Sequence, residues 1–140
     1  MLYLGVQSSG GRVNYTPNPQ HRNSSFSAQK SQWTITVPEE IDCFRTAIGA
    51  SWFGNDCYWG FCLDQSSLRP VGIAPPPYSC PVHFAKFVGD TLQNWHGYPV
   101  AHWVAPWDKP PQGILKGWAS NGIITKPQFA RILRGKKCAL

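Results

Sequence analysis

The chain has 140 residues, a formal net charge of +6 and a charged content of 14%. This length suits one domain with a sizeable core, and no apolar run approaches the ~20 residues that a membrane-spanning helix needs. The charge lies at one end, because residues 1–107 are neutral whereas residues 108–140 hold seven basic residues and one acidic residue. A neutral body with a basic end predicts a surface for an anionic partner, for which nucleic acid is the usual candidate.

The N-terminal segment is polar. Residues 7–31 are rich in Ser, Asn, Gln, Gly and Pro, and we expect residues 1–31 to form an extended polar arm. The opening stretch Met1–Val6 is too short for the apolar core of a signal peptide and has no basic flank. We therefore expect a cytoplasmic protein.

Residues 32–107 are predicted to form a sheet body with one helix. Residues 33–37 alternate and are β-branched, which predicts a strand. Pro38 and the two glutamates after it favour the first turn of a helix that ends near Gly49.

The rest of the body is predicted to be mainly sheet. Gly97 and Pro99 indicate an edge strand or a bulge in its last extended stretch. The predicted segments are strands over 57–63 and 83–88, a long loop over 66–79 and an extended stretch over 95–105.

Residues 108–140 predict a basic helical hairpin. Asp108 is suited to cap the first helix, and Gly122 to end it. Thr125 and Gln128 have the spacing of a capping box at the start of the second helix. The predicted fold is α+β: a single domain with a small, mostly antiparallel sheet, one preceding helix and this C-terminal hairpin.

The hairpin supplies the candidate nucleic-acid-binding residues. Arg131 and Arg134 are spaced i, i+3 and share one face of the second helix, although solvated charges on an ordinary helical pair would look the same. The candidates are Lys126, Arg131, Arg134, Lys136 and Lys137.

A second constellation lies before the hairpin. Trp95, His96, Tyr98 and Trp103 suit a partner or base-stacking surface. An alternative is acid/base chemistry on a phosphodiester, with His96 titrating near neutrality and Lys86 holding negative charge. A further alternative is that the aromatic residues are core anchors.

Five cysteines form an odd set, which argues against a disulfide framework in a chain without a signal peptide. Cys57, Cys62, Cys80 and His83 are an alternative zinc-ligand set, but the first pair is spaced more widely than usual. Buried structural thiols are the expected interpretation, and we expect no metal and no cofactor.

Part of the chain resembles short uncharacterised bacterial or mobile-element proteins. The resemblance covers roughly residues 83–138 and implies a bacterial or phage setting without a known activity. Its matching residues are Lys86–Asp90, Trp95–Val100, Pro110, Pro111, Ile114, Leu115, Trp118, Gly122, Ile124, Lys126, Arg131, Ile132, Gly135, Lys136 and Cys138.

These patterns predict a protein that binds nucleic acid or a nucleoprotein complex, in phage–host conflict or gene regulation. One alternative is a small metal-independent ribonuclease of toxin type that uses His96. A second alternative is an interaction protein or inhibitor for an acidic protein partner. No membrane association is expected.

Overall fold

A computed structural model describes residues 4–8 and 11–140, so residues 1–3 and 9–10 of the predicted polar arm lie outside the described residues. In chain order the elements are β1 (Leu4–Ser8), β2 (Gly11–Tyr15), the 3₁₀ helices η1 (Pro19–His21) and η2 (Ser24–Phe26), β3 (Gln32–Trp33), α1 (Val37–Gly49), β4 (Phe53–Gly54), β5 (Cys57–Gly60), β6 (Cys62–Asp64), β7 (Ser67–Arg69), β8 (Gly72–Ile73), β9 (Pro81–Val82), β10 (Phe84–Gly89), β11 (Asn94–Val100), the 3₁₀ helix η3 (Pro106–Asp108), α2 (Gln112–Ser120) and α3 (Lys126–Leu133).

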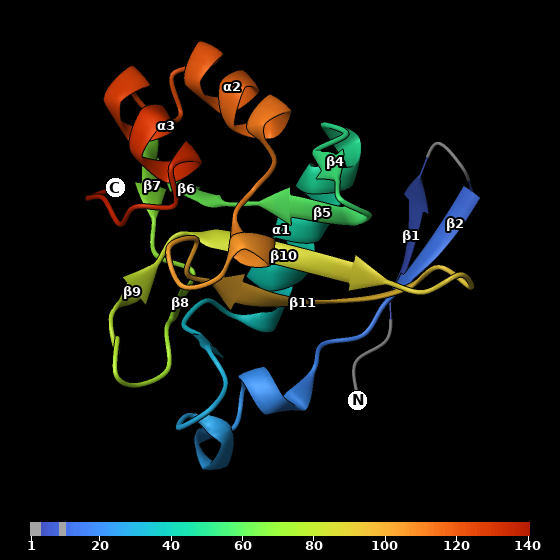
Figure 1. The fold of residues 1–140 in the computed structure, drawn as a ribbon. Helices are drawn as coiled ribbons and strands as arrows, with labels where there is room; N and C mark the ends of the chain where they lie inside the picture. Colours follow the sequence, from blue (N-terminus) through green and yellow to red (C-terminus); the bar gives the residue numbers. More distant parts are fainter. Residues whose placement is uncertain (1–3, 9–10) are drawn as a thin grey trace.

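The main sheet has the strand order β1-β2-β11-β10-β5-β4. Its neighbouring strands are antiparallel, except that β2 and β11 run parallel. Two smaller sheets have the orders β3-β8-β9 and β6-β7. Figure 1 shows α1 behind the main sheet and α2 beside α3 above β5. The predicted α+β fold, with its mostly antiparallel sheet and C-terminal helical pair, is confirmed.

Part of the polar N-terminal segment belongs to the sheet. Asn14 and Tyr15 of β2 pair with Asn94 and Trp95 of β11. Tyr15 and Val13 are buried on the same face of the strand, as their alternate positions require. The segment expected to be an arm therefore supplies an inner strand.

The helix predicted to open at Pro38 is confirmed as α1, and its start is fixed by a capping box. The backbone N–H of Glu39 donates to the Thr36 hydroxyl at 3.3 Å, and the Thr36 N–H donates back to Glu39 at 2.9 Å. These bonds and the guanidinium of Arg69, at 2.5 Å, lower the pKa of the Glu39 carboxyl to about 2. The next residue, Glu40, is fully buried instead of lying in a solvated first turn.

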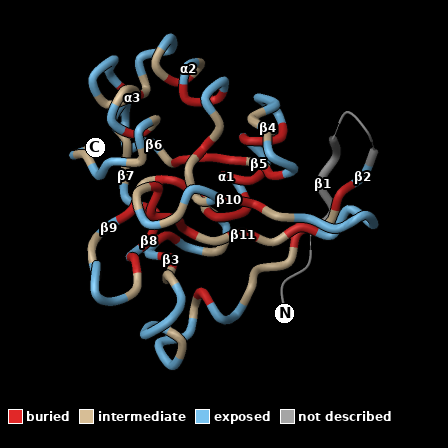
Figure 2. The backbone as a smooth tube through the Cα atoms, viewed as in Figure 1, coloured by how far each residue is buried: buried red, intermediate tan, exposed pale blue. Residues whose placement is uncertain are grey.

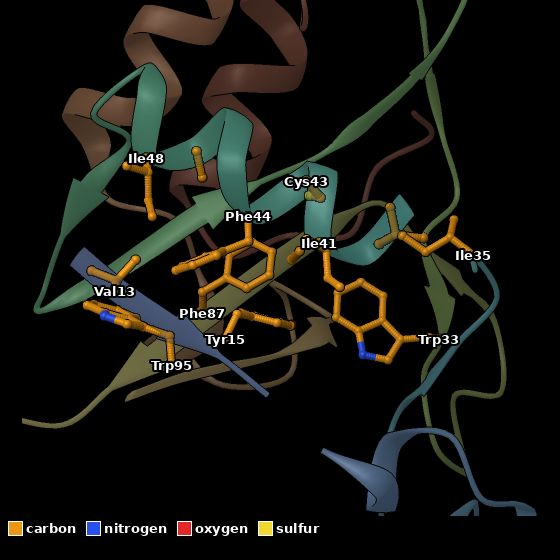
Figure 3. Close-up of a cluster of buried hydrophobic side chains, with 13 residues drawn as sticks. Val13, Tyr15, Trp33, Ile35, Ile41, Cys43, Phe44, Ile48, Phe87 and Trp95 are labelled. Atoms are coloured by element: carbon orange, nitrogen blue, oxygen red, sulfur yellow. The ribbon is translucent and has the colours of Figure 1, made fainter. Parts of the chain in front are cut away.

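Two apolar cores lie on the two faces of the sheet. Figure 3 shows the first, where Phe44 of α1 meets Phe87 and Tyr15. Successive residues of β10 point to opposite faces, so Phe84 enters the second core while Phe87 enters the first. Trp118 of α2 packs on Phe84 in that second core. The buried backbone in Figure 2 follows these central strands and the inner faces of the helices.

β11 lies between β2 and β10 at Asn94 and Trp95, and its register with β10 runs without a bulge. From His96 onward no strand of the described residues pairs with its other side, so the predicted edge applies to the part that holds Gly97 and Pro99. Its ladder with β2 ends at Trp95, so the missing N–H of Pro99 interrupts no pairing on that side. Gly97 is required by packing, because a Cβ at this position would meet the Phe87 ring and the Tyr15 hydroxyl.

The helical pair differs from its prediction at one end. Asp108 closes η3 and caps no helix, since α2 begins later and has Pro111 at its N-cap. The Thr125–Gln128 capping box is confirmed, and Gly135 follows α3 with a φ of +72°. None of the helices within the described ranges has the length and apolar surface that crossing a bilayer requires.

Candidate functional site

A hollow of about 500 Å³ lies on the part of the second sheet face that α2 and α3 leave uncovered. Tyr98 and His96 of β11 share this face because they are two residues apart. The side chains of the lining that can titrate or stack come from four separate stretches of the chain. They are His21, Lys30, Tyr78, His96, Tyr98, Trp107 and Asp108.

His21 is held in a fixed orientation in this hollow. Its ring stacks on Tyr98 with centroids 5.1 Å apart and an angle of 14° between the ring planes. Its Nδ1 lies 2.7 Å from the carbonyl oxygen of Ser31. A carbonyl oxygen only accepts hydrogen bonds, so Nδ1 carries a proton and Nε2 is the nitrogen left for a ligand. The Ser31 hydroxyl donates to the Pro99 carbonyl at 2.7 Å, which ties this loop to β11.

The residue after His21 anchors η1 to α1. The Arg22 guanidinium donates to the buried Glu40 carboxylate at 2.8 and 3.0 Å and to the Ile35 carbonyl at 2.9 Å. Tyr15 also donates to Glu40. Burial raises the pKa of the Glu40 carboxyl, while these donors favour its charged form. The network holds the segment that carries His21 against the body of the protein.

Lys86 does not line the hollow. Its ammonium group is buried, donates to the Trp107 carbonyl at 2.6 Å and lies 3.6 Å from Asp108. It also lies 6.0 Å from the centroid of the Tyr98 ring. The alternative in which Lys86 holds a substrate's negative charge is therefore not supported by its position. Lys86 instead fixes η3, which lies in front of β10 in Figure 1.

The four residues predicted to form a stacking surface are not brought together. Trp95 is 7% exposed and belongs to the first core, because it follows the opposite alternation from His96 and Tyr98. Trp103 lies outside the lining of the hollow, with its ring 6.5 Å from Tyr78. Trp107, which the sequence did not single out, is 71% exposed at the rim.

The five predicted nucleic-acid-binding cations, Lys126, Arg131, Arg134, Lys136 and Lys137, are all exposed. Two backbone contacts order the segment that carries them. Arg131 donates to the Lys137 carbonyl at 2.8 Å, and Nε2 of His102 donates to the Lys136 carbonyl at 2.8 Å. We call these five residues the basic surface.

One turn connects the basic surface to the hollow. His102 holds the Lys136 backbone, and the Lys137 ammonium lies 5.3 Å from the centroid of the Trp103 ring. The neighbours of this pair, Ala101 and Val104, line the hollow. The turn over residues 101–104 therefore has the basic segment on one side and the hollow on the other.

The alternative zinc set is not assembled. Cys57 lies in the second core, and Cys62 packs against the first. Cys80 and His83 share a small hollow of about 200 Å³ with His102. Within residues 4–8 and 11–140, no three His, Cys, Asp or Glu side chains are grouped so that they could hold a metal ion.

Burial lowers the pKa of both histidines in the main hollow. For His21, the Ser31 carbonyl raises the pKa in part, whereas the charges of Lys30 and His96 lower it further. The pKa of His96 is lowered by burial alone. Its Nδ1 is buried and has no hydrogen-bond partner among the described residues. The hollow therefore holds two imidazoles in different surroundings.

Comparisons of the chain with models of known protein families, with curated proteins and with solved structures found no match.

Proposed function

We propose that the protein binds single-stranded nucleic acid, with phosphates on the basic surface and a base in the hollow. The strongest support is that the turn over residues 101–104 contacts both regions. His102 and Trp103 contact the segment that carries the basic surface, and Ala101 and Val104 line the hollow. Cations that track a phosphate backbone beside aromatic rings that accept bases are the usual means of binding single strands. A cytoplasmic role in phage–host conflict or gene regulation is the setting proposed for this activity.

The aromatic side chains favour a single strand over a duplex. Trp107 is 71% exposed and Tyr78 is 45% exposed, and both line the hollow beside Tyr98. A base within a duplex has both faces covered by its neighbours, whereas an unpaired base can stack on such rings. The hollow, at about 500 Å³, has room for a group of that size.

Replacing Arg131, Arg134, Lys136 and Lys137 together with glutamine is expected to weaken binding of a single-stranded oligonucleotide. The logarithm of the affinity falls with the logarithm of the salt concentration, and each lost phosphate contact makes this slope less steep by about 0.7. Four lost contacts therefore make it less steep by about 3. Fluorescence anisotropy titrations across a salt series measure both quantities. We expect a loss of affinity of at least about tenfold near 0.1 M salt.

The matched control compares two pairs of arginines. Arg131→Gln/Arg134→Gln and Arg12→Gln/Arg45→Gln remove the same charge, but Arg12 and Arg45 are exposed on other elements, β2 and α1. Only the first pair is expected to change the salt slope. Equal losses from both pairs would indicate a nonspecific effect of net charge, and an unchanged slope in the fourfold variant would refute the proposal. Binding of an acidic peptide but of no oligonucleotide would refute it in favour of a protein partner.

Trp107→Ala is expected to lower the affinity for the same oligonucleotide by about 5- to 150-fold, which is the range for the loss of one base stack. Stacking involves no counterion release, so the salt slope should stay as in the wild type. Phe53→Ala is the control, because Phe53 is a 49% exposed aromatic residue outside the hollow. Wild-type affinity in Trp107→Ala would show that the rim of the hollow takes no base.

A further inference from the structure

We propose that the hollow cleaves single-stranded RNA without a metal ion, with His96 as general base and His21 as general acid. This inference rests on the proposed function and adds an activity and a substrate class to it. Cleavage within an RNA strand requires a base near the 2′-hydroxyl and an acid near the 5′-oxygen that leaves. It requires no bound water, because the nucleophile belongs to the substrate.

The two imidazoles reach the hollow from separate elements. His96 belongs to β11, and His21 belongs to η1 and stacks on Tyr98 at 5.1 Å. Both side chains line the same hollow. Tyr98 therefore lies next to both histidines, two residues from one along the strand and in ring contact with the other.

Their contacts assign the roles. Nδ1 of His21 donates to the Ser31 carbonyl, and that acceptor stabilises the protonated ring. Nε2 of a protonated His21 can then deliver a proton into the hollow. His96 has no such acceptor on its buried Nδ1, so its neutral form is favoured, as a general base requires.

The reaction balances with these two groups alone. His96 takes the proton of the 2′-hydroxyl while the 2′-oxygen forms a bond to the adjacent phosphorus. The bond from phosphorus to the 5′-oxygen breaks, and His21 gives its proton to that oxygen. The products are a 2′,3′-cyclic phosphate and a 5′-hydroxyl. Proton exchange with solvent then restores both histidines.

Lys30 is the cation placed to hold a phosphate oxygen during this step. It lines the hollow, and its charge acts on His21. Asp108 lies on the same lining but faces the buried ammonium group of Lys86, so its charge is partly balanced. The hollow can thus accept an anionic phosphate between the two imidazoles.

The test is incubation with a 5′-labelled single-stranded RNA that contains all sixteen dinucleotide steps, in the presence of EDTA. The wild type is expected to leave cyclic-phosphate ends, and the all-deoxy version of the strand should bind without being cut. His96→Ala and His21→Ala should each slow cleavage by about 10²-fold or more. His83→Ala is the control, because His83 is also a partly buried histidine but lies outside this hollow.

An RNA with sulfur in place of the 5′-bridging oxygen separates the two roles. A thiolate leaves without being protonated, so this substrate needs no general acid. It should restore cleavage by His21→Ala but not by His96→Ala. If His21→Ala fails to fold, His21→Gln is used, since its amide can still donate to the Ser31 carbonyl.

The pH dependence gives an independent readout in the wild type. Cleavage should fall at low pH as His96 is protonated and at high pH as His21 loses its proton. Burial lowers the pKa of both, so the optimum should lie below the ordinary imidazole value of about 6.5. The other titratable groups that face them are Lys30, Tyr78, Tyr98 and Asp108 in the hollow and Asp90 beside His96.

The outcomes separate this inference from the proposed function. RNA that is bound with a salt-dependent affinity but stays intact between pH 4.5 and 8 overturns the nuclease and leaves the binding proposal standing. Cleavage that survives His96→Ala, or that also disappears in His83→Ala, overturns the assignment of the site. An absence of both binding and cleavage overturns both proposals.

Discussion

Glu40→Leu is expected to lower the free energy of unfolding by about 3 kcal/mol, because it leaves a guanidinium and a phenol without their shared partner. The Glu40 carboxylate is fully buried, and it accepts hydrogen bonds from Arg22 and Tyr15. Leucine fills most of the volume but accepts no hydrogen bond. Urea unfolding at neutral pH, followed by tryptophan fluorescence, measures the change.

Two further variants test whether the loss comes from the buried Glu40 carboxylate and its pairing with Arg22. Glu39→Leu alters the adjacent glutamate, which is partly exposed, and should cost about 1 kcal/mol through the lost capping box. Adding Arg22→Met to Glu40→Leu should regain part of the loss, because the unpaired charge is then gone. Wild-type stability in Glu40→Leu would show that Arg22 reaches solvent at no cost. Because Arg22 follows His21, the same variant should also loosen the hollow.

Trp118→Ala is expected to lower the free energy of unfolding by about 3 to 5 kcal/mol and to detach α2 and α3 from the sheet. Its ring is fully buried and packs against Trp52, Phe61 and Phe84, with centroids 5.0 to 5.5 Å away. Trp118 is the only aromatic residue of α2. Hydrogen exchange should show lost protection in α2 and α3 while α1 stays protected.

Two substitutions serve as controls for the Trp118 prediction. Trp118→Phe should cost much less, because the indole Nε1 is buried without a hydrogen-bond partner among the described residues. Lys116→Ala lies on the exposed side of α2 and should change stability by no more than about 0.5 kcal/mol. Equal losses from Trp118→Ala and Lys116→Ala would mean that the packing of the Trp118 ring does not hold the pair against the sheet, since both changes raise helix propensity.

The features that could be predicted from sequence have local causes. The capping box at Thr125 involves residues three positions apart and begins the helix that its pattern predicts. The same spacing from Thr36 to Glu39 caps α1, where the predicted strand over 33–37 is wrong beyond Trp33. The alternation in β10 likewise assigns Phe84 and Phe87 to opposite faces. The charge of the C-terminal segment also made its exposed cations recognisable from composition alone.

The features that could not be predicted depend on contacts between distant segments. His21 has no local signal, because its stacking partner Tyr98 lies on a strand much later in the chain. Gly97 indicated the edge, but the Phe87 ring that requires a glycine there could not be inferred from the sequence. Lys86 was predicted to be available for a substrate, but its ammonium group donates to the Trp107 carbonyl and pairs with Asp108. A search of the sequence for acid/base residues therefore found one imidazole of the hollow and missed the other.

Because β2 pairs with β11, β2 must wait for this partner strand while the chain is synthesised on the ribosome. Asn14 and its partner Asn94 are 80 residues apart. At about 5 to 20 residues per second, translation takes about 4 to 16 s to cover that interval. During this time β2 has β1 as a partner but lacks β11, and Tyr15 lacks its contact with Phe87 of β10. A nascent chain that stalls before β11 emerges would expose the Val13 and Tyr15 side chains and an unpaired strand edge, which makes it a target for chaperones or for aggregation.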